Sequence, residues 1–278
     1  MGNIDGVWMD ASVKNKNSLG FDLIWNNGFC KDFISYIKTE PGYRAGKLLT
    51  MLSGLKYAYD ENFILPLSSE MLENGMLKDF PGVMEENYAA LRSAYAFLYF
   101  YPGKKLFAPD VKSLVEISGK AGKRNEWAVA FDDFITEINA FYAKEKLLNG
   151  FDEKEGSLEW IDHKAGVSNV VSFIRKSGKK NEFLYIVANF SNENFDDLKL
   201  VVPAAGKYTE VLSTDNVKFG GKGVCNADTI ATQEAPYDES TNMLSVRMAP
   251  MSISIFMYKP FTAKELAAIA EHKRQLRI

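Results

Sequence analysis

The sequence predicts an α/β part over residues 1–149, followed by an all-β part over residues 150–260 and a closing helix over residues 261–278. In the first part, apolar residues recur at helical spacing, and short apolar runs separate the helical segments. From Gly150 on, short segments alternate or run apolar between turn residues, which is typical of antiparallel strands. At 278 residues, the chain has room for two domains.

Three segments of the first part have the apolar pattern of helices. They are residues 29–38, 85–100 and 124–146. In the first segment, Phe29, Phe33 and Ile37 form one stripe. The last segment carries the same kind of stripe from Trp127 to Tyr142. The middle segment is almost wholly apolar, which predicts a helix buried on most sides.

The apolar runs between these helices suit buried parallel strands. They are IDGVWMD at residues 4–10, FILPLS at residues 63–68 and KKLFAPD at residues 104–110. The last of them follows a turn at Pro102 and Gly103.

Seven segments of the second part have the pattern of strands. They are residues 157–163, 170–176, 183–191, 198–203, 208–214, 243–248 and 252–259. Turn residues such as Ser177 and Gly178 separate them, so an antiparallel sandwich or barrel is expected. After the last strand, Thr262 and Glu265 form a capping box that predicts the start of the closing helix.

Composition and charge exclude several classes of partner. The chain has 33 Lys and Arg against 36 Asp and Glu, a net charge of −3, so no basic field is available for nucleic acid. No apolar run reaches the roughly 20 residues of a membrane helix. The first ten residues lack the cationic flank and apolar stretch of a signal peptide. We therefore expect a cytoplasmic protein that binds neither nucleic acid nor membrane.

The residues that most often carry metals and nucleophilic chemistry are few and scattered. The two cysteines are Cys30 and Cys225, and the two histidines are His163 and His272. Their spacing matches no metal-ligand pattern, and a zinc site or a Ser-His triad needs more than they offer. We expect no metal and no cofactor.

Several segments resemble bacterial 1,4-α-glucan (glycogen) branching enzymes of the α-amylase superfamily. LYIVANFS, YTEVLSTDNVKFGGKGVCN and MAPMSISIFMY resemble the all-β domain of that family. GFDLIWNNGF and KLLTMLSGLKYAYDENFILPLS resemble the stretch that ends at its seventh barrel strand, and YPGKKLF resembles the eighth strand. The resemblance runs from about Gly20 to Lys259 and covers the second half of such an enzyme.

The resemblance implies a (β/α)8 barrel, which takes about 250 residues. Residues 1–149 supply only three convincing strands. The expected fold is therefore a reduced, incomplete (β/α)8-type barrel, followed by an antiparallel β-sandwich and a C-terminal helix.

The resemblance also implies glycogen biosynthesis by glycosyl transfer, with α-glucan as the partner. One carboxylate attacks the anomeric carbon, a second acts as acid and then as base, and a third steadies the distorted sugar. The 6-hydroxyl of another glucan then takes the place of water, which yields an α-1,6 branch.

The catalytic set implied by the resemblance is incomplete. IDGVWMDA resembles the segment with the nucleophile and places Asp10 in that role, although Trp8 stands where the family has an arginine. A rival alignment sets this stretch beside a loop after the fifth strand and leaves Asp10 without a role. No segment between Asp10 and Leu19 can supply the strand with the acid/base glutamate. The general acid is therefore expected to be absent.

The segment that carries the third carboxylate in the family is altered as well. Ser69 and Glu70 replace the family's His-Asp pair after the seventh strand, so Glu70 is a degraded stabilising carboxylate and Ser69 a degraded substrate contact. The glycine-rich segment after the eighth strand is cut to residues 108–110.

Two aromatic residues are candidate sugar platforms. Trp25 and Tyr101 join Ser69 as candidate substrate-binding residues, with core or helix-end packing as the alternative for both aromatic side chains. Trp160 lies in the segment that leads to the all-β part, where burial is favoured over sugar contact.

Three hypotheses of function follow. The first is a branching enzyme that uses Asp10 and Glu70, alone or with a second polypeptide that supplies the acid. The second is a non-catalytic relative that keeps affinity for α-glucan. The third is a structural or interaction protein that self-associates through the open edge of the barrel. The missing acid favours the second, so we expect that this chain alone does not catalyse branching.

Overall fold

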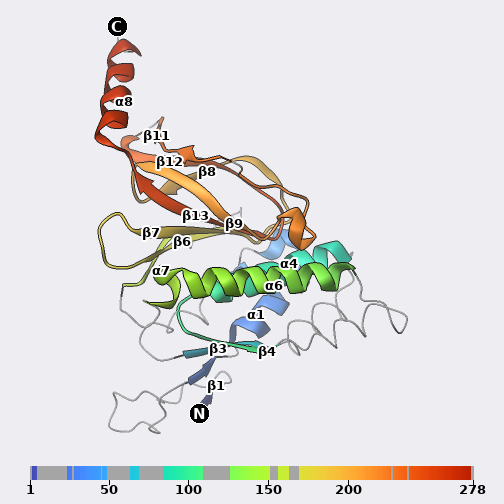
Figure 1. Cartoon of the computed structure of the whole chain (residues 1–278). Helices are drawn as coiled ribbons and strands as arrows, with labels where there is room; N and C mark the ends of the chain where they lie inside the picture. Colours follow the sequence, from blue (N-terminus) through green and yellow to red (C-terminus); the bar gives the residue numbers. More distant parts are fainter. Residues whose placement is uncertain are drawn as a thin grey trace.

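The structure is a computed structural model. It describes the backbone of residues 2–4, 24–26, 28–44, 46–48, 63–68, 84–108, 126–150, 156–162, 169–226, 228–236 and 238–276. Within these residues, helices and a parallel sheet come first, two antiparallel sheets follow, and a helix ends the chain (Figure 1).

Four parallel strands form the first sheet in the order β1-β2-β3-β4. The strands are β1 (Gly2–Ile4), β2 (Ile24–Asn26), β3 (Phe63–Ser68) and β4 (Lys104–Ala108). The predicted strands at residues 63–68 and 104–110 are confirmed as β3 and β4. The predicted strand at residues 4–10 meets β1 only at Ile4, and its other residues lie outside the described part of the chain. The expected barrel remnant stays a prediction, because the described residues form one four-stranded parallel sheet.

The three predicted helices are confirmed. They are α1 (Gly28–Lys38), α4 (Met84–Phe100) and α6 (Glu126–Lys144), with the short α7 (Lys146–Asn149) and the 3-10 turn η1 (Pro41–Tyr43) beside them. Helix α4 links β3 to β4, which are paired in parallel register from Ile64 and Lys104 onward. From Ala90 to Tyr101 every residue is buried, as the nearly unbroken apolar pattern predicts.

The all-β part consists of a six-stranded sheet in the order β10-β9-β13-β7-β6-β5 and a three-stranded sheet in the order β11-β12-β8. The strands are β5 (Leu158–Asp162), β6 (Val170–Lys176), β7 (Phe183–Asn189), β8 (Phe195–Val202), β9 (Gly206–Ser213), β10 (Ile230–Ala231), β11 (Gln233–Ala235), β12 (Asp238–Met248) and β13 (Ser252–Pro260). All pairs within these sheets are antiparallel. The seven predicted strands are confirmed, and the short β10 and β11 are additional.

The six-stranded sheet is the middle layer of the molecule, with helices on one face and the three-stranded sheet on the other (Figure 1). Every residue of β7 is buried. A strand that is covered on both faces favours apolar residues at consecutive positions, which explains the unbroken apolar run of β7 from Phe183 to Ala188. Strands β6 and β13 are also buried at consecutive positions, with serines among their apolar residues.

The two faces of this sheet belong to two separate cores. Tyr185, Val187 and Phe256 face Leu244 and Val246 of the three-stranded sheet, in the core of the sandwich. Phe173, Ile186 and Ile255 face the helices in a larger core that includes α4 and α6. This larger core crosses residue 150 without a break, so the helical part and the sandwich share their main hydrophobic core. The domain division at residues 149 and 260 stays a prediction.

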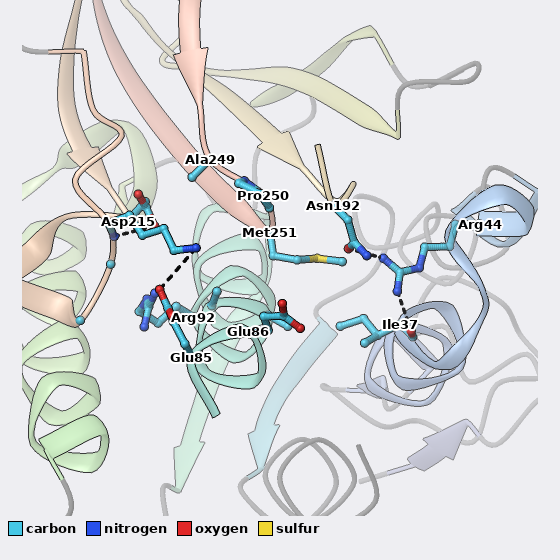
Figure 2. Close-up of a pocket in the computed structure, with 15 residues that line it drawn as sticks. Ile37, Arg44, Glu85, Glu86, Arg92, Asn192, Asp215, Ala249, Pro250 and Met251 are labelled. Carbon is cyan, nitrogen blue, oxygen red and sulfur yellow. Dashed lines mark hydrogen bonds and ion pairs between the residues drawn. The ribbon is translucent and has the colours of Figure 1, made fainter. Parts of the chain in front are cut away.

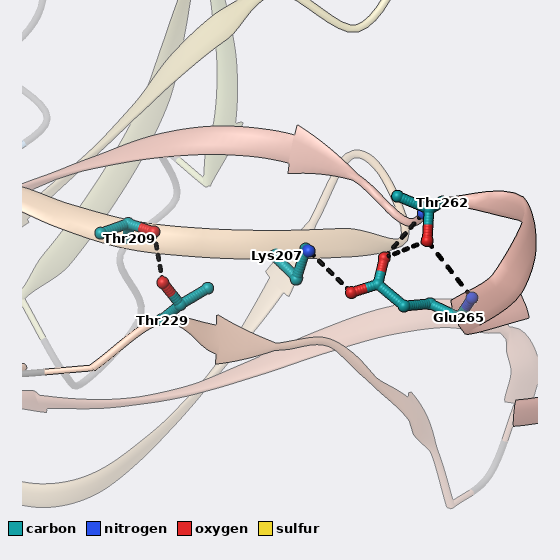
Figure 3. Close-up of polar contacts among 5 residues, drawn as sticks. All are labelled: Lys207, Thr209, Thr229, Thr262 and Glu265. Carbon is teal, nitrogen blue, oxygen red and sulfur yellow. Dashed lines mark hydrogen bonds and ion pairs between the residues drawn. The ribbon is translucent and has the colours of Figure 1, made fainter. Parts of the chain in front are cut away.

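The closing helix α8 (Ala263–Leu276) begins with the predicted capping box (Figure 3). Thr262 N donates to Glu265 Oε2 at 2.7 Å, and Glu265 N donates to Thr262 Oγ1 at 3.3 Å. The other oxygen of Glu265 accepts from Lys207 Nζ of β9 at 2.7 Å. Glu265 thus closes the first turn of α8 and holds it against the sandwich.

Acid should release the first turn of α8. The Lys207 hydrogen bond and the two Thr262 hydrogen bonds lower the pKa of Glu265 to about 2 from the ordinary 4.5. A lowered pKa stabilises the fold above pH 4.5, and this contribution is lost as the pH falls from there toward 2. We expect the helical signal of α8 to decline over this range, as followed by backbone NMR shifts.

The Glu265→Gln variant separates this effect from other effects of acid on the protein. Glutamine can keep the capping hydrogen bonds but has no proton to gain. The variant should therefore lose the part of the acid transition that belongs to Glu265. If the helical signal of α8 declines with pH in the same way in both proteins, protonation of Glu265 is not the cause.

Within the described residues, no helix has both the length and the apolar character needed to cross a membrane.

Candidate functional site

Three of the predicted site residues, Asp10, Ser69 and Glu70, lie outside the described residues, and their roles stay predictions. Ser69 directly follows β3, whose last residue is Ser68. The backbone of Trp25 lies in β2, in register with Ile64 of β3. The substrate-binding role of Trp25 stays a prediction too.

Tyr101 is a packing residue in the structure. Its side chain is 0% exposed, and its ring lies 6.1 Å from the rings of both Trp160 and Phe173. Trp160 and Phe173 are cross-strand partners in β5 and β6, with ring centroids 5.3 Å apart. This burial favours the packing alternative for Tyr101, and its role in substrate binding stays a prediction. Trp160 is half-buried against the same core, as expected from its position.

The described residues enclose a pocket of about 290 Å³ where α1 and α4 meet the sandwich (Figure 2). We call it the junction pocket. Its charged and polar lining residues are Arg44, Glu85, Glu86, Arg92, Asn192, Asp215 and Lys222, and its apolar lining includes Ile37, Ala89, Pro250 and Met251. Sequence patterns did not indicate this pocket.

Arg44 closes the carboxyl end of α1 and joins it to the sandwich. Its guanidinium donates to the carbonyl oxygens of Ile37 at 2.9 Å and Thr39 at 2.8 Å, and to Oδ1 of Asn192 at 2.8 Å. Cations are favourable at the end of a helix, where free carbonyl groups carry negative partial charge. The side chain is buried, and burial lowers its pKa, against the opposing effect of Tyr36.

Arg92 joins α4 to the loop that follows β9. The residue is 2% exposed, and its Nε donates to the carbonyl oxygen of Thr214 at 2.9 Å. Burial lowers the pKa of Arg92 to about 10, while Asp215 and Glu85 work in the opposite direction, so the group is charged at neutral pH. Its Nη1 has no hydrogen-bond partner among the described residues. A buried donor in this state calls for an oxygen acceptor at the pocket wall.

Asp215 shapes the loop opposite Arg92. Its carboxylate accepts from the backbone nitrogens of Lys222 at 3.2 Å and Val224 at 2.9 Å. Gly221 passes so close to Asp215 that an added Cβ would lie 2.1 Å from the Asp215 carbonyl oxygen. Only glycine fits there, which fixes the course of the loop and thereby the place of Lys222 on the pocket rim.

The rim of the pocket carries exposed charges. Lys222 Nζ lies 3.5 Å from Glu85 Oε1, with side chains 67% and 38% exposed. Glu85 and Glu86 belong to the first turn of α4, where negative charge is favourable. A pair as exposed as this one adds little stability, so its groups are available to a ligand.

Met251 supplies an apolar surface in an unusual backbone conformation. It follows Pro250 in the turn between β12 and β13 and has a φ of 45°, in the left-handed region. A residue other than glycine is held there at a cost of order 1–3 kcal/mol. Its backbone nitrogen donates to Ser191 O at 3.1 Å. Figure 2 shows its side chain extending across the pocket toward Asn192.

Among the described residues, no group of three or more His, Cys, Asp or Glu side chains could hold a metal ion. His272 lies on the exposed surface of α8, and Cys225 forms no disulfide with any residue that the structure describes. The charged and polar groups of the junction pocket are hydrogen-bond donors and acceptors, so they can bind a ligand.

Residues 160–259 match the alpha amylase C-terminal all-beta domain. The chain is also similar to two curated bacterial enzymes. A 1,4-alpha-glucan branching enzyme of Geobacillus stearothermophilus is 32% identical over 255 residues, which cover 85% of this chain and 39% of the relative. That of Bacillus caldolyticus is 32% identical over 247 residues, which cover 85% of this chain and 37% of the relative. The chain thus spans well under half of the length of these relatives.

The solved structure of an Anoxybacillus alpha-amylase has a TM-score of 0.51 at 11% identity, over 88% of this chain and 48% of that chain. At this identity the likeness concerns the fold alone.

Proposed function

We propose that this chain, a homologue of the 1,4-alpha-glucan branching enzymes with an alpha-amylase C-terminal domain, binds α-glucan and does not itself catalyse branching. The observation that carries the proposal is the similarity to enzymes that act on α-glucan, which extends over 85% of this chain. The similarity includes the helical part as well as the sandwich, so it extends beyond the all-β domain.

The parallel sheet is, in this proposal, the remnant of a (β/α)8 barrel. Its strands follow one another in chain order, and α4 connects β3 to β4, as a barrel requires. In such barrels the active site lies at the carboxyl ends of the strands. Ser69 and Glu70 come directly after β3 and would therefore lie at that end.

The absence of catalysis is proposed from the carboxylates. A retaining mechanism needs a nucleophile and an acid/base on opposite sides of the scissile bond. Asp10 is the candidate nucleophile, and no glutamate is available in the position of the acid. Without the acid, the leaving oxygen must depart unprotonated, at a loss of about 10²–10⁴ in rate. Glu70 is one methylene longer than the aspartate that it replaces. Its carboxylate would therefore be displaced from the catalytic position, which is costly for the rate.

The second candidate is an interaction protein. The strands β1 and β4 form the two ends of the described parallel sheet, and open parallel edges can pair with another chain. Size-exclusion chromatography tests the second candidate by measuring the oligomeric state, because only the interaction protein requires a partner chain. A monomer of 31.2 kDa would rule out obligate pairing between copies.

A branching assay tests the absence of catalysis. The purified chain is incubated with amylose, and new α-1,6 linkages are counted as the chain ends that a debranching enzyme releases. A 1,4-alpha-glucan branching enzyme serves as the positive control, and Glu70→Gln as the matched variant. We expect no branches above background for the chain or the variant. Branches that the chain forms and the variant does not would show an active site that includes Glu70 and would contradict the proposal.

A further inference from the structure

The polar lining of the junction pocket is balanced in charge. Arg44, Arg92 and Lys222 are opposed by Glu85, Glu86 and Asp215 around the same cavity. A ligand of high net charge would meet repulsion from one half of this set. The cations can only donate hydrogen bonds, and the carboxylates can only accept them. Internal hydrogen bonds already engage Arg44 and Asp215. A ligand that both donates and accepts at closely spaced positions, as a polyol does, matches the groups that remain, which are Arg92, Lys222, Glu85 and Glu86.

The pocket also offers an apolar surface beside the charges. Pro250 and the side chain of Met251 form it, and the left-handed backbone of Met251 directs that side chain across the cavity (Figure 2). Strained residues of this kind cluster at ligand sites. A pyranose ring presents hydroxyl groups at its edge and C–H groups on its face, so it fits a pocket with a charged wall and an apolar one.

We propose that the junction pocket, whose lining includes none of the site residues predicted from the sequence, binds a short segment of α-glucan. This inference rests on the proposed function for the choice of α-glucan among polyols. At about 290 Å³ the cavity is at the small end of ligand pockets, roughly 300–1,000 Å³, which suits a short oligosaccharide end. An oxygen of the sugar or of a bridging water would complete the hydrogen bonds of the buried Arg92 Nη1.

Calorimetric titration of the full chain with maltoheptaose tests the site. Lys222→Ala and Glu86→Gln each remove one charged partner from the rim, and both residues are exposed. Each should weaken binding roughly tenfold. Lys218→Ala is the matched control, because Lys218 lies in the same loop and forms one exposed ion pair, with Glu137, away from the pocket. It should leave the affinity within about twofold.

Met251→Gly tests the apolar wall. Glycine accepts the left-handed backbone at position 251 without strain. The relief of strain offsets part of the stability that is lost with the packing of the Met251 side chain. The variant should keep its cooperative thermal unfolding and still bind maltoheptaose several-fold more weakly. A thermal scan of each variant identifies any that has lost its fold.

The outcomes separate this inference from the proposed function. If the chain binds maltoheptaose and the variants at positions 86, 222 and 251 bind it equally well, the inference is overturned and the proposed function stands. If the chain binds no α-glucan, both fail. If inorganic phosphate displaces maltoheptaose, the pocket is an anion site and the inference fails alone.

Discussion

Replacing Arg175 by alanine should lower the free energy of unfolding by about 3 kcal/mol. Arg175 lies in β6 with a side chain that is 0% exposed. Its guanidinium donates to the carbonyl oxygens of Phe100 at 2.7 Å and Leu148 at 3.4 Å, at the carboxyl ends of α4 and α7. One buried cation therefore holds two helix ends on the six-stranded sheet. Alanine would leave these carbonyl groups without their donor and a cavity beside them.

Denaturant unfolding, followed by tryptophan fluorescence, measures this effect. The neighbouring Lys176→Ala variant is the control, because Lys176 is on the same strand and forms only an exposed ion pair with Glu159. The Lys176→Ala substitution should lower the free energy of unfolding by less than about 1 kcal/mol. Equal effects of the two substitutions would mean that the hydrogen bonds of Arg175 contribute nothing beyond those of a surface charge.

Replacing Tyr101 by alanine should lower the free energy of unfolding by about 3–5 kcal/mol, as for other large aromatic residues in a packed core. Besides Trp160 and Phe173, its ring stacks on Phe97 of α4 at 6.1 Å, so it joins α4 to the first two strands of the sandwich. The matched control is Tyr43→Ala, because the Tyr43 side chain is 73% exposed. That substitution should change stability by no more than about 0.5 kcal/mol.

Tyr101→Ala and a second variant, Tyr101→Phe, decide between packing and sugar contact for Tyr101. If Tyr101 packs, Tyr101→Ala lowers the unfolding midpoint, while Tyr101→Phe keeps both the ring contacts and the affinity for maltoheptaose. Loss of affinity in Tyr101→Phe at unchanged stability would instead assign its hydroxyl group to a substrate site. It would contradict the buried position of the ring.

The sequence predicts the long elements of the fold well, for a physical reason. Helix α6 has one apolar stripe because it is covered on one side, and periodicity detects this. Strands β6, β7 and β13 are covered on both faces, so each is rich in apolar residues between turn residues and is equally clear in the sequence. Strands β2, β10 and β11 have only two or three residues, too few for any period to appear.

The junction pocket could not be predicted because its groups come from segments far apart in the chain. Arg44 meets Asn192 across 148 positions, and Arg92 meets Thr214 across 122 positions. One local signal was present: Arg92 is the only charged residue of α4 after Glu86, in a helix that the pattern already placed in the core. A lone charge in a buried helix needs a partner, but the sequence does not say which one.

The role of Tyr101 could not be decided from the sequence either. It lies between the apolar segment of α4 and the turn at Pro102 and Gly103, so both helix-end packing and sugar contact were open. Its burial depends on Trp160 and Phe173, which belong to the sandwich. Contacts between the helical part and the sandwich decide such cases, and no local pattern encodes them.

The proposed function requires that this chain keeps affinity for α-glucan. Co-sedimentation with insoluble amylose measures this affinity, with cellulose as a control of the same sugar in β-1,4 linkage. We expect the folded chain in the amylose pellet, its release by soluble maltoheptaose, and none of it in the cellulose pellet. A folded chain that stays in the supernatant with both polymers would contradict the claim and favour the interaction protein instead.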